Sequence, residues 1–303
     1  MFSNIDFYSA YQYDYYVYKI SLLQSILKKP ESFKNDFLDG NLDGFILEDF
    51  IRVLKSEIRQ SYFHNIETLF ELIFALIPEE GVAKDLDLFI NLSTSNWRNN
   101  FKRIQKINSQ IDGLSFLDDT IKIDEIDNPI SIARYIFYYG MLPDKKIPKE
   151  YINLIDSSLS AIKTGLKIIA SDFCEREEYN GYKHSLRVIP ATKGFQLIDK
   201  LSEKVLLDLD LKESMSYITK NSELNEIILH TKLFDTDRDS QMVLFCSNLI
   251  SNIIQLRKGG LSKTQQEGQF PIHFFGEDQV IKMSKKNIKA DLILSFKIKS
   301  SNY

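Results

Sequence analysis

The stretch that decides the fold is FILEDFIRVLKSEIRQSYFHNIETLFELIFALI, residues 45–77. Its apolar residues recur every three or four positions, the period of one face of an α-helix. They are Phe50, Val53, Leu54, Ile58, Tyr62, Ile66, Leu69, Phe70, Ile73 and Leu76. Pro78 ends the pattern, because proline cannot continue a helix. A helix of this length extends roughly 50 Å, and we predict that it forms the spine of a helical bundle.

A second long helix is predicted for residues 148–182, where Ile152, Ile155, Leu159, Ile162, Leu166 and Ile169 share the same spacing. Shorter patterns predict further helices at residues 8–28, 85–92, 95–107, 131–139 and 240–256. Gly259 and Gly260 are expected to end the last one, since glycine favours helix ends.

The pattern changes after residue 184. Short segments rich in β-branched residues follow one another between turn residues, which indicates strands; they cover residues 185–198, 204–210, 215–219 and 226–233. For the alternating pattern at 292–298 two interpretations stay open, a further strand or a partly ordered tail. The predicted fold class is α+β, mostly α: a helical bundle with a small antiparallel β-sheet in the C-terminal third. The predicted domains are a helical bundle at 1–184 and an α+β segment at 185–303 packed on it, with one continuous domain as the alternative.

Composition narrows the class of protein. Of the 303 residues 44% are hydrophobic, which is enough to bury a sizeable core. The net charge is only −4, so the whole chain has no overall attraction to nucleic acid or an anionic membrane. An RNA partner would need a local basic patch, such as the lysines between residues 282 and 299.

Known cofactor and metal motifs are missing from the sequence. It contains no phosphate-binding Walker loop, no GxGxxG after a strand, no HExxH and no nucleophile elbow. The two cysteines, Cys174 and Cys246, do not form a CxxC pair. The first residues carry acids and tyrosines instead of a secretory signal, and no window reaches the ~18 apolar residues of a membrane span. We therefore expect a cytoplasmic protein with no cofactor, no metal and no membrane partner.

Two polar groups stand out as candidate sites. Arg59 precedes His64 by five residues inside the long predicted helix. At the end of the second long helix lie Asn180 and His184, one turn apart, together with the cations Arg176, Lys183 and Arg187.

The Arg59-x4-His64 spacing on a long amphipathic helix resembles the motif of the HEPN superfamily. Many HEPN proteins are metal-independent RNases in toxin, antiviral and abortive-infection systems, in which facing Arg and His motifs form one composite site. The resemblance covers about 40 residues. It implies an endoribonuclease in a bacterial defence or toxin system, with Arg59 and His64 as catalytic residues. His184 and Asn180 would be the second contributors, and Arg176, Lys183 and Arg187 would bind RNA.

The implied chemistry is coherent. RNA cleavage without metal needs a base for the 2′-hydroxyl, a cation for the phosphorane and an acid for the leaving oxygen. Histidine and arginine supply these groups. Five residues on an ideal helix correspond to about 140° of rotation and ~7.5 Å of rise, so both side chains must reach toward a shared point.

Structural explanations remain open for both groups. Arg59 can pair with an acidic residue on a neighbouring turn, such as Glu48, and a carboxylate on its own helix can hold His64. Cations at the end of the second helix can compensate the helix dipole. Asp235, Asp237 and Asp239 alternate like ligands of a hard cation but lack the glycine and glutamate of a calcium loop, which favours helix capping.

The sequence is therefore compatible with two functions. The first is the HEPN-type ribonuclease. The second is a non-catalytic helical sensor or binding module whose partner is a protein, a second copy of the chain or a nucleic acid.

Overall fold

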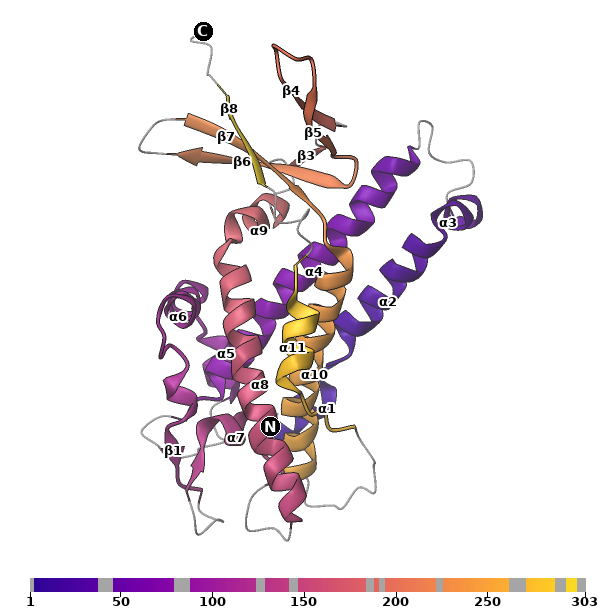
Figure 1. Cartoon of the computed structure of the whole chain (residues 1–303). Helices are drawn as coiled ribbons and strands as arrows, with labels where there is room; N and C mark the ends of the chain where they lie inside the picture. The colour runs from indigo at the N-terminus through magenta and orange to yellow at the C-terminus, as the bar shows by residue number, and fades with distance from the viewer. Residues whose placement is uncertain are drawn as a thin grey trace. The chain divides into compact units, whose positions relative to one another are not determined.

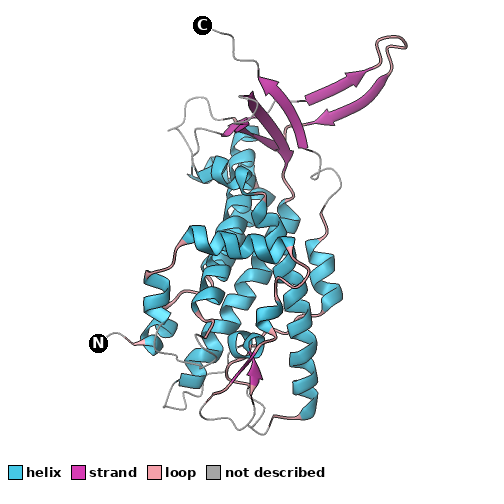
Figure 2. Cartoon of the chain, turned by 90° about the vertical axis from the view of Figure 1, so that its left-hand side faces the viewer, coloured by secondary structure: helices cyan, strands magenta, loops and turns pink. Residues whose placement is uncertain are grey.

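The predicted spine is a single helix, α4 (Leu47–Ala75), shown in Figure 1. The computed structural model describes residues 3–37, 46–78, 88–123, 129–141, 147–183, 188–190, 194–221, 226–261, 271–286 and 293–298. Helices dominate and the strands concentrate after residue 187 (Figure 2), so the predicted fold class, α+β and mostly α, is confirmed.

Most of the remaining helices were predicted with other bounds, whereas α3 and α11 below were not predicted. They are α1 (Asn4–Ala10), α2 (Tyr15–Lys28), α3 (Pro30–Phe37), α5 (Leu88–Ser93), α6 (Trp97–Ser109), α7 (Ile132–Phe137), α8 (Lys149–Cys174), α9 (Arg176–Lys183), α10 (Thr236–Leu261) and α11 (Glu277–Ser284), with a 3-10 turn, η3 (Ser115–Leu117). The predicted helix 8–28 is thus two helices, and 148–182 is divided between α8 and α9. No helix among the described residues is long and apolar enough to span a lipid bilayer.

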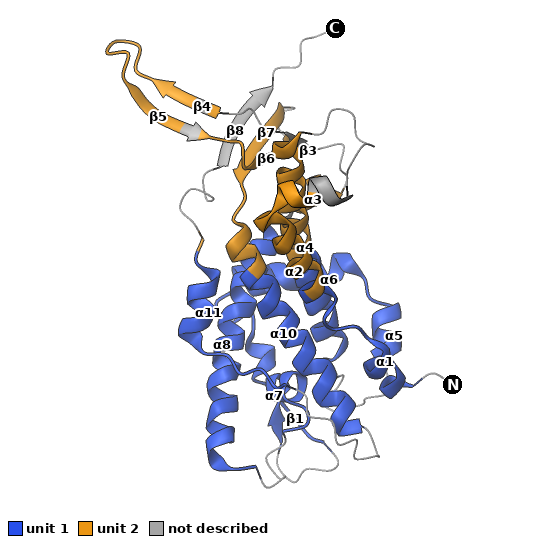
Figure 3. Cartoon of the chain, turned by 90° about the vertical axis from the view of Figure 1, so that its right-hand side faces the viewer, with its two compact units in different colours: residues 1–17, 64–174, 241–285 blue, residues 18–63, 175–240, 286–303 orange. Residues whose placement is uncertain are grey.

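The chain divides into two compact units (Figure 3). Unit 1 comprises residues 1–17, 64–174 and 241–285, and unit 2 comprises residues 18–63, 175–240 and 286–303. The predicted boundary at 184/185 does not coincide with this division, because each unit takes residues from both sides of it.

Unit 1 is a helical core. The buried stripe of α4 continues through Ile66, Leu69 and Phe70, and α8 and α10 supply Ile162, Leu166, Leu249 and Ile253. The buried amide of Asn65 on α4 donates to the Val243 carbonyl at 2.9 Å and to Ser247 Oγ at 2.8 Å, both on α10. Gly165 on α8 lies against the ring of Phe245 on α10, where a Cβ atom would overlap the ring. The thiol of Cys246 is fully buried in this core.

The predicted end of α10 at Gly259-Gly260 is wrong. The helix continues through both glycines to Leu261, and Gly260 packs closely on the ring of Tyr139. A small residue is needed there for close packing, so these glycines do not act as a stop signal.

Unit 2 contains the main sheet. Its antiparallel strands are β3 (Val188–Pro190), β6 (Ser214–Asn221), β7 (Glu226–Leu233) and β8 (Ile293–Ile298), hydrogen-bonded in the order β3-β6-β7-β8. In this sheet Tyr217 is opposite His230, and their rings stack at 5.0 Å between centroids. Helix α9 packs on β6.

Two smaller antiparallel pairs complete the described strands. β4 (Gly194–Ile198) and β5 (Val205–Asp210) form a hairpin separate from the main sheet, visible in Figures 1 and 3. β1 (Thr120–Ile121) and β2 (Ile130–Ser131) form a two-residue pair in unit 1.

Candidate functional site

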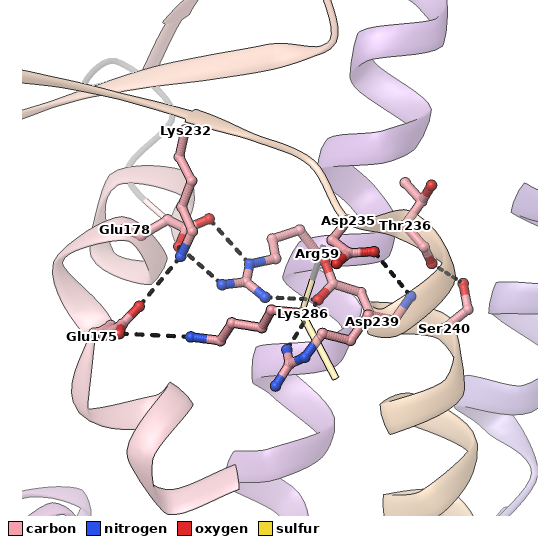
Figure 4. Close-up of polar contacts among 10 residues, drawn as sticks. Arg59, Glu175, Glu178, Lys232, Asp235, Thr236, Asp239, Ser240 and Lys286 are labelled. Carbon is pink, nitrogen blue, oxygen red and sulfur yellow. Dashed lines mark hydrogen bonds and ion pairs between the residues drawn. The ribbon is translucent and has the colours of Figure 1, made fainter. Parts of the chain in front are cut away.

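Arg59 lies at the centre of a buried charge cluster within unit 2 (Figure 4). Only 6% of its surface is exposed. The amphipathic pattern of α4 explains this position: Arg59 follows the buried Ile58 and precedes the buried Tyr62 and Phe63. Its guanidinium lies 4.7 Å from the centroid of the Phe63 ring, and Phe63 in turn stacks on Tyr179 of α9 at 5.3 Å.

The first partner of Arg59 is Glu178 on α9. Arg59 Nε and Nη2 each donate to one carboxylate oxygen of Glu178 at 3.1 Å, which is the two-point arrangement that makes Arg–carboxylate pairs strong. Lys232 on β7 donates to Glu178 Oε2 at 3.1 Å and also reaches Glu175 at 3.3 Å. One buried carboxylate therefore joins α4, α9 and the main sheet.

The second partner is Asp239 on the first turns of α10. Arg59 Nη1 donates to Asp239 Oδ1 at 2.7 Å, and Arg238 Nη1 lies 3.8 Å from the same oxygen. Both Asp239 and Arg238 are buried. The other oxygen, Asp239 Oδ2, is buried without a hydrogen-bond partner in the described part of the chain.

The two carboxyl groups have opposite pKa shifts. Burial alone would raise the pKa of Glu178, but the charges of Arg59 and Lys232 outweigh it and lower the pKa to about 2. For Asp239 burial prevails over Arg59 and Arg238, so its pKa rises to about 6. The contrast follows from the contacts, because Glu178 accepts three hydrogen bonds from two cations whereas Asp239 Oδ2 accepts none.

This arrangement limits what Arg59 can do chemically. To bind a phosphate, its guanidinium would have to leave two buried carboxylates, and breaking a buried ion pair typically costs about 3–5 kcal/mol. The contacts fit a cation that holds three elements of unit 2 together.

The structure places the other predicted residues as follows. His64 lies on α4 in unit 1, is partly exposed, and its carbonyl accepts a hydrogen bond from Thr68 Oγ1 at 2.9 Å. Asn180 is partly exposed on α9, two residues and thus about 200° around the helix from Glu178, so it is on the side of α9 away from Arg59.

Lys183 is exposed, with Nζ 5.4 Å from the Tyr179 ring centroid. Arg176 is the first residue of α9, while His184 and Arg187 are outside the described residues. Contacts between Arg59 and Glu178 and between Phe63 and Tyr179 bring α4 to α9. That Arg59, His64, Asn180 and His184 form one composite site stays a prediction.

Sequence reasoning missed the partners of Arg59. It suggested acidic residues on the same helix, such as Glu48, whereas Glu178 and Asp239 are 119 and 180 positions away in sequence. Helix capping is performed by Asp235, whose Oδ1 accepts the Arg238 amide at 3.3 Å. Asp239, four residues and thus about one turn later, interacts with Arg59 instead. No short-range pattern signals such a pairing.

Comparison with known proteins gives no assignment: no family model, no curated protein and no solved structure matches the chain. The likeness to HEPN proteins therefore rests on Arg59, His64 and the helix that carries them.

Proposed function

We propose that the protein is a non-catalytic helical binding module that docks a partner protein through the β4–β5 hairpin. The observation that carries the proposal is an uncovered apolar face on this hairpin. Among the described strands, β4 and β5 pair only with each other, and an isolated two-stranded hairpin is marginally stable in water.

The register of the hairpin separates its two faces. Leu197 is opposite Leu207, and after a register shift between Leu197 and Ile198 the next pair is Ile198 and Val205. Val205 and Leu207 are two residues apart and share a face, so the shift brings Ile198 to the face of Leu197. Leu197, Ile198 and Val205 are each about half exposed. Gln196 is opposite Asp208, and both are exposed on the other face. An apolar face of this kind is normally buried, so a partner that covers it gains about 25 cal/mol per Å² of apolar surface.

Charge suggests the chemistry of the partner. Residues 194–210 contain four carboxylates, Asp199, Glu203, Asp208 and Asp210, and two cations, Lys200 and Lys204, a net of −2. The complementary partner is an apolar protein surface bordered by basic side chains.

Affinity measurement with matched variants tests the proposal. Leu197→Thr with Val205→Thr removes apolar surface while keeping good strand formers. The control, Gln196→Thr with Asp208→Thr, changes the polar face by the same number of residues. A partner isolated with the wild-type chain is purified and titrated against all three proteins. The apolar-face variant should bind about tenfold more weakly or worse, and the control should bind like wild type apart from a small charge effect.

Two outcomes would reject this docking surface. One is equal affinity of the two double variants. The other is a wild-type dimer in sedimentation that the apolar-face variant converts to a monomer, because the occupant would then be a second copy of the chain.

A metal-independent HEPN-type ribonuclease is the second candidate. It is favoured by the partial exposure of His64 on the long helix. In that case purified protein cleaves tRNA, mRNA or rRNA in EDTA, and His64→Ala abolishes cleavage without lowering the melting temperature. Absence of cleavage by wild type with its natural activator present would reject this candidate.

A further inference from the structure

A polar pocket lies within unit 1 between the end of α4, helix α5 and the first turns of α6. Its volume is about 360 Å³, at the small end of ligand sites. Among the described residues that line it, two are charged, Glu71 and Arg103, and Phe74 and several asparagines lie beside them.

Arg103 is a cation in the pocket wall that has no counter-ion among the residues that the structure describes. Its guanidinium carbon is 3.9 Å from the centroid of the Phe74 ring, a cation–π contact that helps to position the group. No carboxylate in the described ranges pairs with it. Arg103 is exposed, and partial desolvation at the pocket wall lowers its pKa. An exposed guanidinium at the mouth of a pocket, with no acceptor among the described residues, is suited to bind a carboxylate at two points.

Glu71 supplies the opposite charge nearby. It precedes Phe74 by three residues on α4, a spacing that places side chains on neighbouring parts of one helix face. Glu71 forms no ion pair with Arg103 or with another cation of the described chain. The described wall of the pocket therefore presents one cation, one anion and a phenylalanine ring.

The asparagines offer further hydrogen-bonding groups. Asn91 uses its amide NH₂ on the Ala75 carbonyl at 2.8 Å, and Asn100 uses its own on Ser95 Oγ at 2.9 Å. The side-chain carbonyl of each remains as an acceptor for an N–H donor.

We propose that this pocket binds a small zwitterion, of which a free α-amino acid is the simplest form, with the carboxylate on Arg103 and the ammonium on Glu71. A nucleotide is disfavoured, because Arg103 is the only cation among the lining residues that the structure describes and Glu71 repels additional negative charge. This inference is independent of the hairpin and extends the function from docking to sensing a metabolite.

Calorimetric titration of the full chain with each of the twenty amino acids tests the proposal. At least one should bind with a Kd below about 1 mM. Arg103→Gln should weaken that binding about 10- to 100-fold, the size expected for charge-assisted hydrogen bonds. Arg98→Gln is the matched control, because Arg98 is on the same helix, is exposed, and does not line the pocket. The Kd of the Arg98→Gln protein for the amino acid should equal that of wild type.

Two analogues of the bound amino acid identify the contacts. The analogue without its amino group should be insensitive to Glu71→Gln but still weakened by Arg103→Gln. The analogue without its carboxylate should show the reverse pattern. Melting curves verify folding of each variant, and Glu71→Gln carries the test alone if Arg103→Gln fails to fold.

The proposal is overturned if no amino acid binds wild type in this range. It is equally overturned if Arg98→Gln weakens binding as much as Arg103→Gln, or if both analogues respond to the two pocket variants alike.

Discussion

Arg59 illustrates how one side chain can satisfy a sequence motif and a structural role at once. The Arg-x4-His spacing suggests catalysis, while the contacts with Glu178 and Asp239 occupy the guanidinium inside unit 2. Which role holds depends on whether these buried contacts stabilise the unit, and single substitutions measure that.

Glu178→Gln should lower the free energy of unfolding by about 3–5 kcal/mol, because Arg59 and Lys232 lose their shared buried counter-charge. Urea unfolding followed by circular dichroism measures the change. Glu177→Gln is the control, since Glu177 is the preceding residue and is exposed; it should change stability by no more than about 0.5 kcal/mol. A Glu178→Gln protein as stable as the control would show that the pair contributes nothing.

The pH profile of the same variant has a definite sign. The pKa of Glu178 is lowered from 4.5 to about 2, so its contribution is present above pH ~4.5 and is lost as pH falls toward 2. The stability difference between wild type and Glu178→Gln should therefore shrink over that window.

Asp239→Asn should show the opposite dependence. Burial raises the pKa of Asp239 from 3.8 to about 6, so its contribution is fully present below pH ~4 and is lost as pH rises through 6. The stability of wild type relative to Asp239→Asn should therefore fall from pH 5 to pH 7.5. Urea unfolding midpoints of both proteins at the two pH values measure this. An unchanged difference would place the titration of Asp239 outside this range.

At the scale of the elements, the close contact between Gly165 of α8 and Phe245 of α10 allows packing in unit 1 to be tested. Gly165→Ala should destabilise the protein by about 1–3 kcal/mol through overpacking against Phe245, although alanine is the better helix former by about 1 kcal/mol. Ser160→Ala, at an exposed position of α8, is the control and should be neutral or slightly stabilising. A stabilised Gly165→Ala would mean that the helices can separate at this point.

Element positions were largely predictable because most reflect local periodicity. The apolar repeat located α4 to within two residues at each end, and the strand predicted at 226–233 has the bounds of β7. The end of α10 was not predictable, because Gly260 serves a contact with Tyr139, about 120 residues earlier in the chain. The same reason applies to Glu178 and Asp239: tertiary contacts between distant residues leave no local pattern.

On the scale of the whole molecule, each unit is assembled from three separate stretches of chain. A fragment of residues 1–184 contains α4 and α8 but lacks α10, which provides the Val243 and Ser247 contacts of Asn65. It also lacks β6 and β7 of unit 2. We expect this fragment not to unfold cooperatively and to be digested rapidly in limited proteolysis, in contrast to the full chain. A cooperative urea transition of the fragment would contradict this.

The buried thiol of Cys246 allows the opening rate of the unit 1 core to be measured. Burial raises the pKa of this thiol, and only thiolate reacts with alkylating reagents, whereas Cys174 is partly exposed. In a Cys174→Ser variant, labelling should occur only when the core transiently opens, so the labelling rate at high reagent concentration equals the opening rate. Mass spectrometry then measures how often the α8–α10 contact opens transiently, and Gly165→Ala should increase the labelling rate.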